Sequence, residues 1–302
     1  MAAVLNISVR QLHYFLSLVK AGSFSRAARA AGVTQSTLSA AIQALESELG
    51  VTLIDRTGRR MQLLPAGEDF VARARDIVAL IEELPEHARQ AERPLTTRLR
   101  MGVIPSIAPF LLPKILPETR RAFPELQLTL REGLTRVLLE SLRSGTLDVA
   151  LVAHPYDLEA FESVEIGRDP FLLAVRRDHA LANRDSVDAD DLEGEPFLLL
   201  DTGHCLREHV MAAIGSRPLQ GGGDVHATSI TTLVQLVQFG MGVTLLPELA
   251  VKAGVTRGTD ISLVPYQGRN NARSLVLAWR AHAARRNEYQ LFARHLRETC
   301  LK

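Results

Sequence analysis

Cysteine is scarce in this chain of 302 residues, and long hydrophobic runs are absent. The chain has only two cysteines, Cys205 and Cys300, which are too few for a disulfide framework. This scarcity is typical of proteins in a reducing compartment. No run reaches the roughly 18 apolar residues of a membrane span, and residues 1–15 lack the pattern of a secretory signal. We therefore expect a cytoplasmic protein without a membrane partner.

The common motifs of catalysis and metal binding are also missing. The sequence contains no Walker phosphate loop, no HExxH or Cys-x-x-Cys motif and no GxSxG nucleophile elbow. We therefore expect a protein that is not an enzyme and that holds neither a metal nor a cofactor.

The formal net charge of +1 hides an uneven distribution. Residues 1–65 contain seven basic and three acidic residues, so this segment carries +4 and the remainder of the chain carries −3. A basic module at the N-terminus is compatible with phosphate contacts.

Hydrophobic spacing predicts three helices in this module, over residues 8–20, 23–32 and 34–50. Gly22 can end the first helix, while Ser23 and Thr34 are expected N-caps. The third helix has a buried stripe that comprises Leu38, Ile42, Leu45 and Leu49. A short helix, a glycine turn and a longer amphipathic helix form a helix-turn-helix.

Short polar side chains at the start of the third helix are suited to base edges and phosphates. Beyond Gly50, two short strands around Thr57 and Gly58 predict a hairpin that projects arginines as a wing. A helical bundle with a polar face is the alternative, but the glycine turn and the basic hairpin together favour double-stranded DNA as a partner. The candidate DNA contacts are Thr34, Gln35, Ser36, Thr37, Ser39, Arg56, Arg59 and Arg60.

Residues 67–92 read as a long helix with apolar residues at alternating steps of three and four, as in a coiled coil. This seam comprises Phe70, Ala74, Ile77, Ile81, Leu84 and Ala88. A homodimer through this helix is expected, with an ordinary surface helix as the alternative. Pro85 predicts a kink or an early stop, because an internal proline removes a hydrogen bond and clashes with the preceding turn.

From about residue 98, strands alternate with helices, which predicts parallel βαβ units. We expect an α/β body of two lobes, with lobe I over residues 98–168 and 274–302 and lobe II over residues 169–273. The strands predicted in lobe II are residues 171–179, 197–203, 225–229 and 243–247. A ligand cleft between the lobes should lie at carboxyl ends of strands and N-termini of helices.

Residues 27–67, AARAAGVTQSTLSAAIQALESELGVTLIDRTGRRMQLLPAG, resemble the winged helix-turn-helix signature of LysR-type transcriptional regulators. Ile54 and Pro65 depart from the usual phenylalanine and threonine. The resemblance implies a winged helix-turn-helix DNA-binding domain over residues 1–66 and a dimerisation linker helix over residues 67–93. It further implies an effector domain with the fold of periplasmic binding proteins, a homotetramer, and RNA polymerase as a candidate partner.

Within that family, the segments GHCLREHVM, HATSITTLVQLVQFGMGVTLLPELAV and RDHALANRDSVDADDLEGE are most similar to the peroxide-sensing OxyR branch. The resemblance places Cys205 at the position of the peroxidatic cysteine. It implies an effector pocket made of Ser106, Thr135, His204, Arg207, Glu208 and Arg273.

Reaction with peroxide requires a thiolate, and therefore a cysteine of depressed pKa. The N-terminus of the helix that follows residue 204 should supply part of the positive charge, and Arg207 and His204 can add to it. In the OxyR branch a second cysteine nine residues later closes a disulfide, but this chain has Ile214 there. The usual intramolecular disulfide is therefore not expected. Cys300 is a distant candidate partner or simply a cysteine of the chain terminus.

Two other interpretations remain open for the body. In the first, the cleft binds a small, often anionic metabolite reversibly through Ser106, Thr135, His204 and Arg273, and Cys205 is a buried, inert residue. In the second, the body is a thiol peroxidase with an accessory DNA module, which would turn over peroxide at Cys205.

Overall fold

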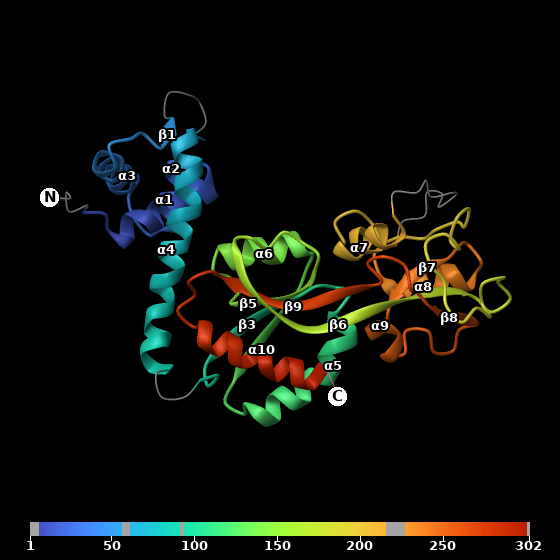
Figure 1. Cartoon of the computed structure of the whole chain (residues 1–302). Coiled ribbons are helices and arrows are strands. Elements are labelled where there is room, and N and C mark those ends of the chain that lie inside the picture. Colours follow the sequence, from blue (N-terminus) through green and yellow to red (C-terminus); the bar gives the residue numbers. More distant parts are fainter. Residues whose placement is uncertain (1–5, 56–60, 91–93, 216–226, 301–302) are drawn as a thin grey trace. The chain divides into compact units, whose positions relative to one another are not determined.

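The computed structural model of the chain describes residues 6–55, 61–90, 94–215 and 227–300. The chain divides near residue 90 into two compact units (Figure 1). None of the helices within those ranges is long and apolar enough to cross a membrane.

The N-terminal unit contains the predicted helix-turn-helix. Its helices are α1 (Val9–Ala21), α2 (Phe24–Ala30) and α3 (Gln35–Leu49). Gly22 ends α1 in the left-handed conformation, with φ of 63°, and Thr34 caps α3 by accepting a 3.1 Å hydrogen bond from the Thr37 N–H. Ser23 occupies the N-cap position of α2 but makes no side-chain cap. These three helices confirm the prediction, and their buried side chains form one core.

The wing is confirmed at its base. Strands β1 (Ile54–Asp55) and β2 (Gln62–Leu63) pair antiparallel. Arg56, Arg59 and Arg60, which the sequence places on the wing, lie outside the described residues. Their contact with DNA stays a prediction.

Helix α4 (Pro65–Gln90) continues through Pro85, so it does not stop there, and the other expectation, a kink at Pro85, stays a prediction. A proline removes only one hydrogen bond of the ladder, and the neighbouring turns keep theirs. The predicted seam is also divided between two faces. Ala74 is fully buried in the helix-turn-helix core and Phe70 packs against Phe15, whereas Ile77 and Leu84 are 44% and 56% exposed.

Lobe I confirms the parallel units. Strand β3 (Arg98–Val103) pairs parallel with both β4 (Gln127–Glu132) and β5 (Val149–His154). Its helices are α5 (Ala108–Ala122), α6 (Thr135–Arg143) and α10 (Arg286–Cys300). Strand β9 (Ala272–Arg280) returns from lobe II and pairs antiparallel with β5.

The two lobes share one long strand, β6 (Phe161–Arg176). Its first part pairs with β9, and from Phe171 onward it pairs with β7 (Thr244–Pro247) and β8 (Ile261–Pro265), so β6 passes from one lobe to the other (Figure 1). The described strands of this unit follow the order β4-β3-β5-β9-β6-β7, with β8 on the other edge of β6.

Lobe II confirms two of its four predicted strands, which lie in β6 and β7, and departs from the prediction elsewhere. Its helices are α7 (Cys205–Ile214), α8 (Ile230–Gln238) and α9 (Glu248–Lys252). The pairs between its described strands are antiparallel, because the crossing strand β6 dictates their direction. Of the predicted strands, residues 197–203 and the described part of residues 225–229 form only isolated parallel bridges, such as Phe197 to Val243 and Leu200 to Ala227.

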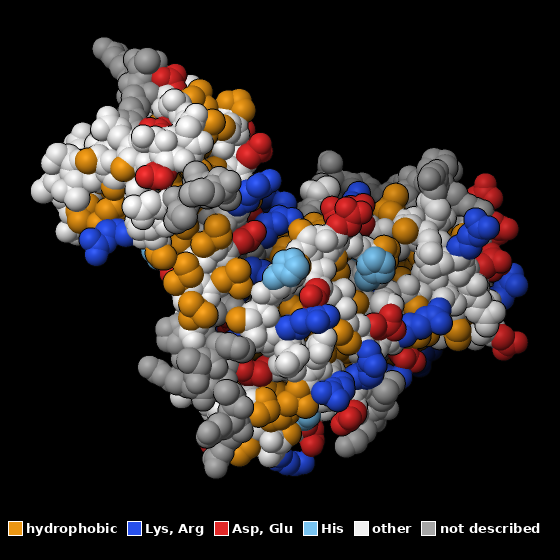
Figure 2. Space-filling model, turned by 60° about the vertical axis from the view of Figure 1, so that its left-hand side comes forward, with side chains coloured by type: hydrophobic (Ala, Val, Ile, Leu, Met, Phe, Trp, Pro, Cys, Tyr) orange, Lys and Arg blue, Asp and Glu red, His pale blue; other side chains and the backbone are white. Residues whose placement is uncertain are grey.

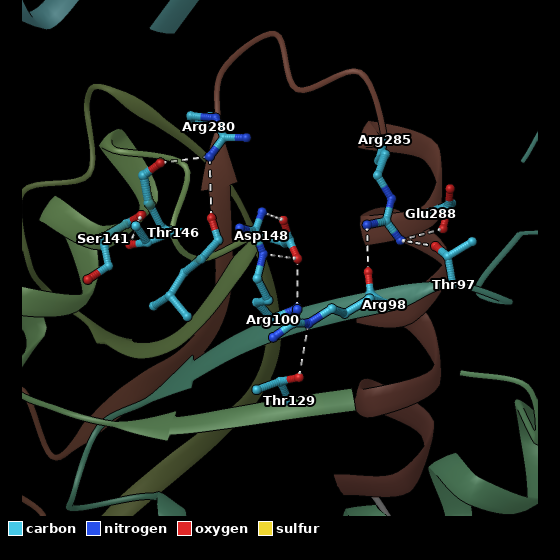
Figure 3. A network of polar contacts seen from close by, with 12 residues as sticks. Thr97, Arg98, Arg100, Thr129, Ser141, Thr146, Asp148, Arg280, Arg285 and Glu288 are labelled. Atoms are coloured by element: carbon cyan, nitrogen blue, oxygen red, sulfur yellow. Dashed lines mark hydrogen bonds and ion pairs between the residues drawn. The ribbon is translucent and has the colours of Figure 1, made fainter. Parts of the chain in front are cut away.

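Buried arginines connect the elements of lobe I (Figure 3). Arg285, just before α10, donates to the Arg98 carbonyl at 2.8 Å and to the Glu288 carboxylate at 3.1 Å. The same carboxylate accepts the Leu95 N–H at 3.1 Å. Arg280, at the end of β9, donates to the Leu142 carbonyl at 2.7 Å. These contacts fix α10 and β9 against β3 and α6.

Replacing Glu288 with alanine should leave the Arg285 guanidinium buried without its carboxylate. We expect a loss of about 3–5 kcal/mol in the free energy of unfolding, because breaking a buried ion pair by removing one partner is strongly destabilising. Urea unfolding followed by circular dichroism measures this. The matched control is Glu118→Ala, which removes an exposed partner of Arg121 at the same spacing and should cost less than about 1 kcal/mol. Equal effects of the two substitutions would contradict the prediction.

Candidate functional site

Cys205 is the first residue of α7. Gly203 has φ of 97°, which lets the chain turn sharply into the helix, and His204 occupies the N-cap position without a side-chain cap. The Cys205 side chain is 5% exposed. Its thiol therefore lies at the positive end of the helix dipole, but away from bulk water.

Cys205 lies where the two lobes meet. Although α7 belongs to lobe II, Cys205 packs within the hydrophobic core of lobe I, while the next residue, Leu206, packs in the core of lobe II. A change in the size or polarity of the Cys205 side chain therefore acts directly on the contact between the lobes.

Cys205 lines a small pocket that three segments form. Ser106 follows β3, Thr135 opens α6, and His204 with Cys205 opens α7; the other lining residues are Ile104, Pro105 and Leu134. The structure thus brings together four of the predicted site residues, at a strand end and at helix N-termini. The pocket measures about 10 Å³, which is near the lower limit for one water molecule.

Arg273, a fifth predicted residue, contacts Ser106 of this pocket and is 1% exposed. Its guanidinium donates to Ser106 Oγ at 2.7 Å and to the Ser106 carbonyl at 3.0 Å. It also donates to the Asp169 carboxylate at 3.0 Å, and that carboxylate accepts the Leu249 N–H at 2.8 Å. Sequence reasoning missed Asp169, because nothing in the local sequence distinguishes it from a surface acid.

Arg207 and Glu208 do not line the pocket. Arg207 points back to donate to the Leu200 carbonyl at 3.1 Å, and Glu208 is exposed on another face of α7. The expectation that Arg207 lowers the pKa of the thiol is therefore wrong, and Arg273 is the cation that acts on it.

Burial raises the pKa of the Cys205 thiol above its ordinary value, and the Thr135 hydroxyl and the Arg273 charge offset only part of this effect. The expected depressed pKa is thus absent from this structure. Thr135 Oγ1 is buried and has no hydrogen-bond partner of ordinary length among the described residues, although it is close enough to influence the sulfur. His204 is also affected, since burial lowers its pKa while Asp201 opposes the shift.

His209 lies one helical turn after Cys205, is 2% exposed, and was not singled out from the sequence. Its Nε2–H donates to the Pro155 carbonyl at 2.9 Å, which connects α7 to the end of β5. Nδ1 is buried without a partner among the described residues. The spacing of four residues from Cys205 is the signal that could have identified it, because residues i and i+4 share a helix face.

Neither the residue that replaces the usual second cysteine nor the remaining cysteine lines the pocket of Cys205. Ile214, at the end of α7, is 3% exposed in the core of lobe II. Cys300 lies at the end of α10 and lines a different pocket, and burial raises the pKa of its thiol.

Comparisons with known proteins agree with this architecture. Residues 92–301 match the LysR substrate binding domain, and residues 9–68 match the bacterial regulatory helix-turn-helix protein of the lysR family. The chain is 38% identical to a hydrogen peroxide-inducible genes activator of Dickeya chrysanthemi, over 97% of this chain and 95% of that protein.

Two solved structures are also similar. A full-length OxyR variant from Pseudomonas aeruginosa has a TM-score of 0.74 and 29% identity, and covers 97% of this chain and 95% of its own. An OxyR variant from Corynebacterium glutamicum with bound H₂O₂ has a TM-score of 0.67 and 30% identity, and covers 98% and 93%.

Because of His209, we expect the free energy of unfolding to decrease as the pH falls. Burial lowers the pKa of His209 to about 4 from 6.5. Between these pH values the unfolded chain binds a proton that the folded chain does not, so stability is lost as the pH falls from 6.5 towards 4. The full loss is about 3 kcal/mol, at about 1.4 kcal/mol for each unit of pKa shift.

Urea unfolding at about pH 7 and about pH 5 measures this loss, which should be smaller in His209→Gln because glutamine keeps a donor for the Pro155 carbonyl. The exposed His13 provides the control, and His13→Gln should retain the wild-type difference between the two pH values. A wild-type difference that His209→Gln leaves unchanged would refute the assignment.

Proposed function

The chain belongs to the LysR family of transcriptional regulators, and we propose that it senses hydrogen peroxide through oxidation of Cys205. The observation that carries this proposal is the size of the pocket at Cys205. A pocket of about 10 Å³ admits a molecule of nearly the size of water and has no room for a carboxylate metabolite. The name of the Dickeya relative and the H₂O₂-bound structure support the same effector.

The proposed reaction is nucleophilic attack by the Cys205 thiolate on one peroxide oxygen. A sulfur–oxygen bond forms and the oxygen–oxygen bond breaks, so the sulfur is oxidised to sulfenic acid. The departing hydroxide takes a proton and leaves as water.

The contacts of Ser106, Arg273 and Thr135 suit this step. Arg273 donates to Ser106 Oγ, so the proton of that hydroxyl is directed elsewhere and can be donated to the departing oxygen. The Arg273 charge stabilises the hydroxide as it forms. Thr135 Oγ1, buried and unpaired among the described residues, can donate to the thiolate or to the peroxide.

Because burial raises the pKa of the thiol, the closed pocket holds the sulfur mainly as the unreactive thiol. Peroxide that enters the pocket supplies polar contacts that burial has removed. We infer that the reactive thiolate forms when peroxide occupies the pocket and makes these contacts.

The oxidised form is proposed to act through the lobe contact. The added oxygen takes up the small space in the pocket and places a polar group against Ser106 and Thr135 of lobe I, and we infer that α7 moves relative to that lobe. The movement changes the effector domains and, through them, how the DNA-binding units meet DNA. Since Ile214 replaces the usual second cysteine, we propose that a small external thiol resolves the sulfenic acid as a mixed disulfide, with release of water.

The alternatives receive less support from the geometry. Reversible binding of a metabolite at Cys205 would require a larger pocket. A thiol peroxidase would need repeated reduction of Cys205 by an external thiol, since Cys300 does not line the pocket of Cys205. We propose a cytoplasmic regulator that is not an enzyme and contacts RNA polymerase at its promoters.

The oxidation has a direct test in intact mass spectrometry during titration with hydrogen peroxide. The wild type should gain one oxygen at low peroxide, Cys205→Ser should gain none, and Cys300→Ser should behave as the wild type. Added glutathione should convert the product to a mixed disulfide on Cys205. If Cys205 resists peroxide as an ordinary thiol does, or if Cys300→Ser abolishes the reaction, the proposal fails.

We further propose a homodimer through α4, with a homotetramer as the assembly on DNA. Ile77 and Leu84 are exposed seven residues apart, with Ile81 partly exposed between them, a spacing that repeats along one face of a coiled coil. Figure 2 shows hydrophobic side chains gathered along the long helix of the N-terminal unit.

Ile77→Glu combined with Leu84→Glu should separate the dimer, because two charges would meet across the apolar seam. Sedimentation velocity should show a loss of the dimer, and the affinity for DNA should fall at least tenfold. Ala72→Glu adds a charge at another exposed position of α4 and should leave the assembly unchanged. A dimer that survives the double substitution would place the interface elsewhere.

A further inference from the structure

Gln35 begins α3, the helix that a helix-turn-helix places in the major groove of DNA. Its side chain is held by the preceding helix, because the Ser25 hydroxyl of α2 donates to Gln35 Oε1 at 2.8 Å. Both side chains are exposed, and neither belongs to the core of this unit. A hydrogen bond between exposed neutral groups adds little to stability, so its importance lies in what Gln35 does.

The turn between α2 and α3 fixes the distance that this contact has to bridge. The Val33 N–H donates to the Ala28 carbonyl at 3.0 Å across the turn, and Ala28 is buried in the core. Thr34 caps α3, and its hydroxyl also hydrogen-bonds with the hydroxyls of Ser36 and Thr37, at 2.9 and 2.8 Å. The first turn of α3 is therefore anchored in the free protein.

The contact with Ser25 determines which end of the Gln35 amide is available. A glutamine amide carries an acceptor oxygen and an NH₂ group with two donors. Because Oε1 faces Ser25, Nε2 occupies the other branch of the amide and directs its N–H groups away from α2. The amide is thus oriented before it meets a base.

We propose that Ser25 is a positioning residue for sequence recognition, which makes Gln35 donate from Nε2 to an acceptor on a base edge. Guanine, adenine and thymine present such an acceptor in the major groove at N7, O6 or O4, whereas cytosine presents only the N4 donor. Cytosine is therefore the base that this arrangement excludes. The proposal rests on DNA binding through α3, and not on the peroxide reaction.

Loss of the Ser25 hydroxyl removes the constraint on the amide. Rotation about the last side-chain bond of a glutamine is broad and roughly two-fold, so an unconstrained amide exchanges its oxygen and its NH₂ group. In the reversed orientation, Oε1 of Gln35 can accept from cytosine N4. Substitution of Ser25 therefore weakens the discrimination between bases at the position that Gln35 reads.

The position that Gln35 reads can be found by selection from a library of random-sequence DNA duplexes. The reduced full-length protein and its Gln35→Ala variant select duplexes in parallel, and the two selected sets are sequenced. We expect the variant to lose base preference at one position of each half-site and to keep it elsewhere. At that position, the wild type should bind a duplex with cytosine at least about tenfold more weakly than one with the preferred base.

Ser25→Ala should reduce this discrimination to within about threefold, whereas Ser25→Thr, which keeps a hydroxyl, should retain it. The matched control is Ser23→Ala, because Ser23 lies at the N-cap of α2 without a side-chain cap. Four duplexes that differ only at this position are compared within each variant. A lost phosphate contact would weaken all four equally, so a changed ratio between them reports on the orientation of Gln35.

Three outcomes would overturn the proposal. They are a Gln35→Ala variant that keeps every base preference, a wild-type preference for cytosine at the position that Gln35 reads, and unchanged discrimination in Ser25→Ala. The selected base itself distinguishes guanine, adenine and thymine as the source of the acceptor. Since the protein stays reduced and no peroxide is present, a failure here is separate from a failure of the proposed sensing reaction.

Discussion

The ion pair between Arg273 and Asp169 is the contact on which the rest of the effector unit depends. Both side chains are almost fully buried at the point where β6 and β9 pass between the lobes. Burying two charges costs several kcal/mol unless each finds good partners. Arg273 finds them in Ser106, and Asp169 in the Leu249 N–H. The pair therefore fixes the end of β3 and the start of α9 relative to the crossing strands.

This arrangement determines the chemistry available to Cys205. A thiol at a helix N-terminus beside an arginine would ordinarily have a depressed pKa, yet burial outweighs both effects here. Because Arg273 is paired with the Asp169 carboxylate, its electrostatic effect on the Cys205 sulfur is reduced. The result is a thiol that the closed structure keeps protonated and shielded, which suits a regulator that has to stay reduced until peroxide reaches it.

Much of the architecture could be predicted from the sequence because it depends on local patterns. Gly22 and Thr34 specify the ends of helices, and the parallel units of lobe I follow from alternating elements. The predictions fail where contacts between residues far apart in the sequence determine the local structure. Residues 161–170 show little hydrophobic alternation, yet they form half of β6 because β9 is available beside them. Pro85 was expected to kink or end α4, but one missing hydrogen bond did not end a helix of 26 residues.

The candidate site shows the same division. Ser106, Thr135, His204 and Cys205 meet in one pocket because strand ends and helix N-termini converge there, as the resemblance implied. Arg207 was expected beside the thiol from its place in the sequence, but helix geometry turns it away, and His209 one turn later takes the buried face. Asp169 could not be found, because its importance comes entirely from its pairing with Arg273, more than a hundred residues away.

The substitution of Ile214 for a second cysteine changes what oxidation has to accomplish. A disulfide across α7 would require its two ends to approach, which would unwind the helix, whereas Ile214 anchors the end of α7 in the core of lobe II. A single sulfenic oxygen acts instead at the other end, where Cys205 packs in the core of lobe I. Polar and larger than the thiol, it makes that packing unfavourable, since an unpaired buried polar group costs about 1–3 kcal/mol. This amount is comparable to the coupling free energies of allosteric proteins, so movement between the lobes can follow without a disulfide.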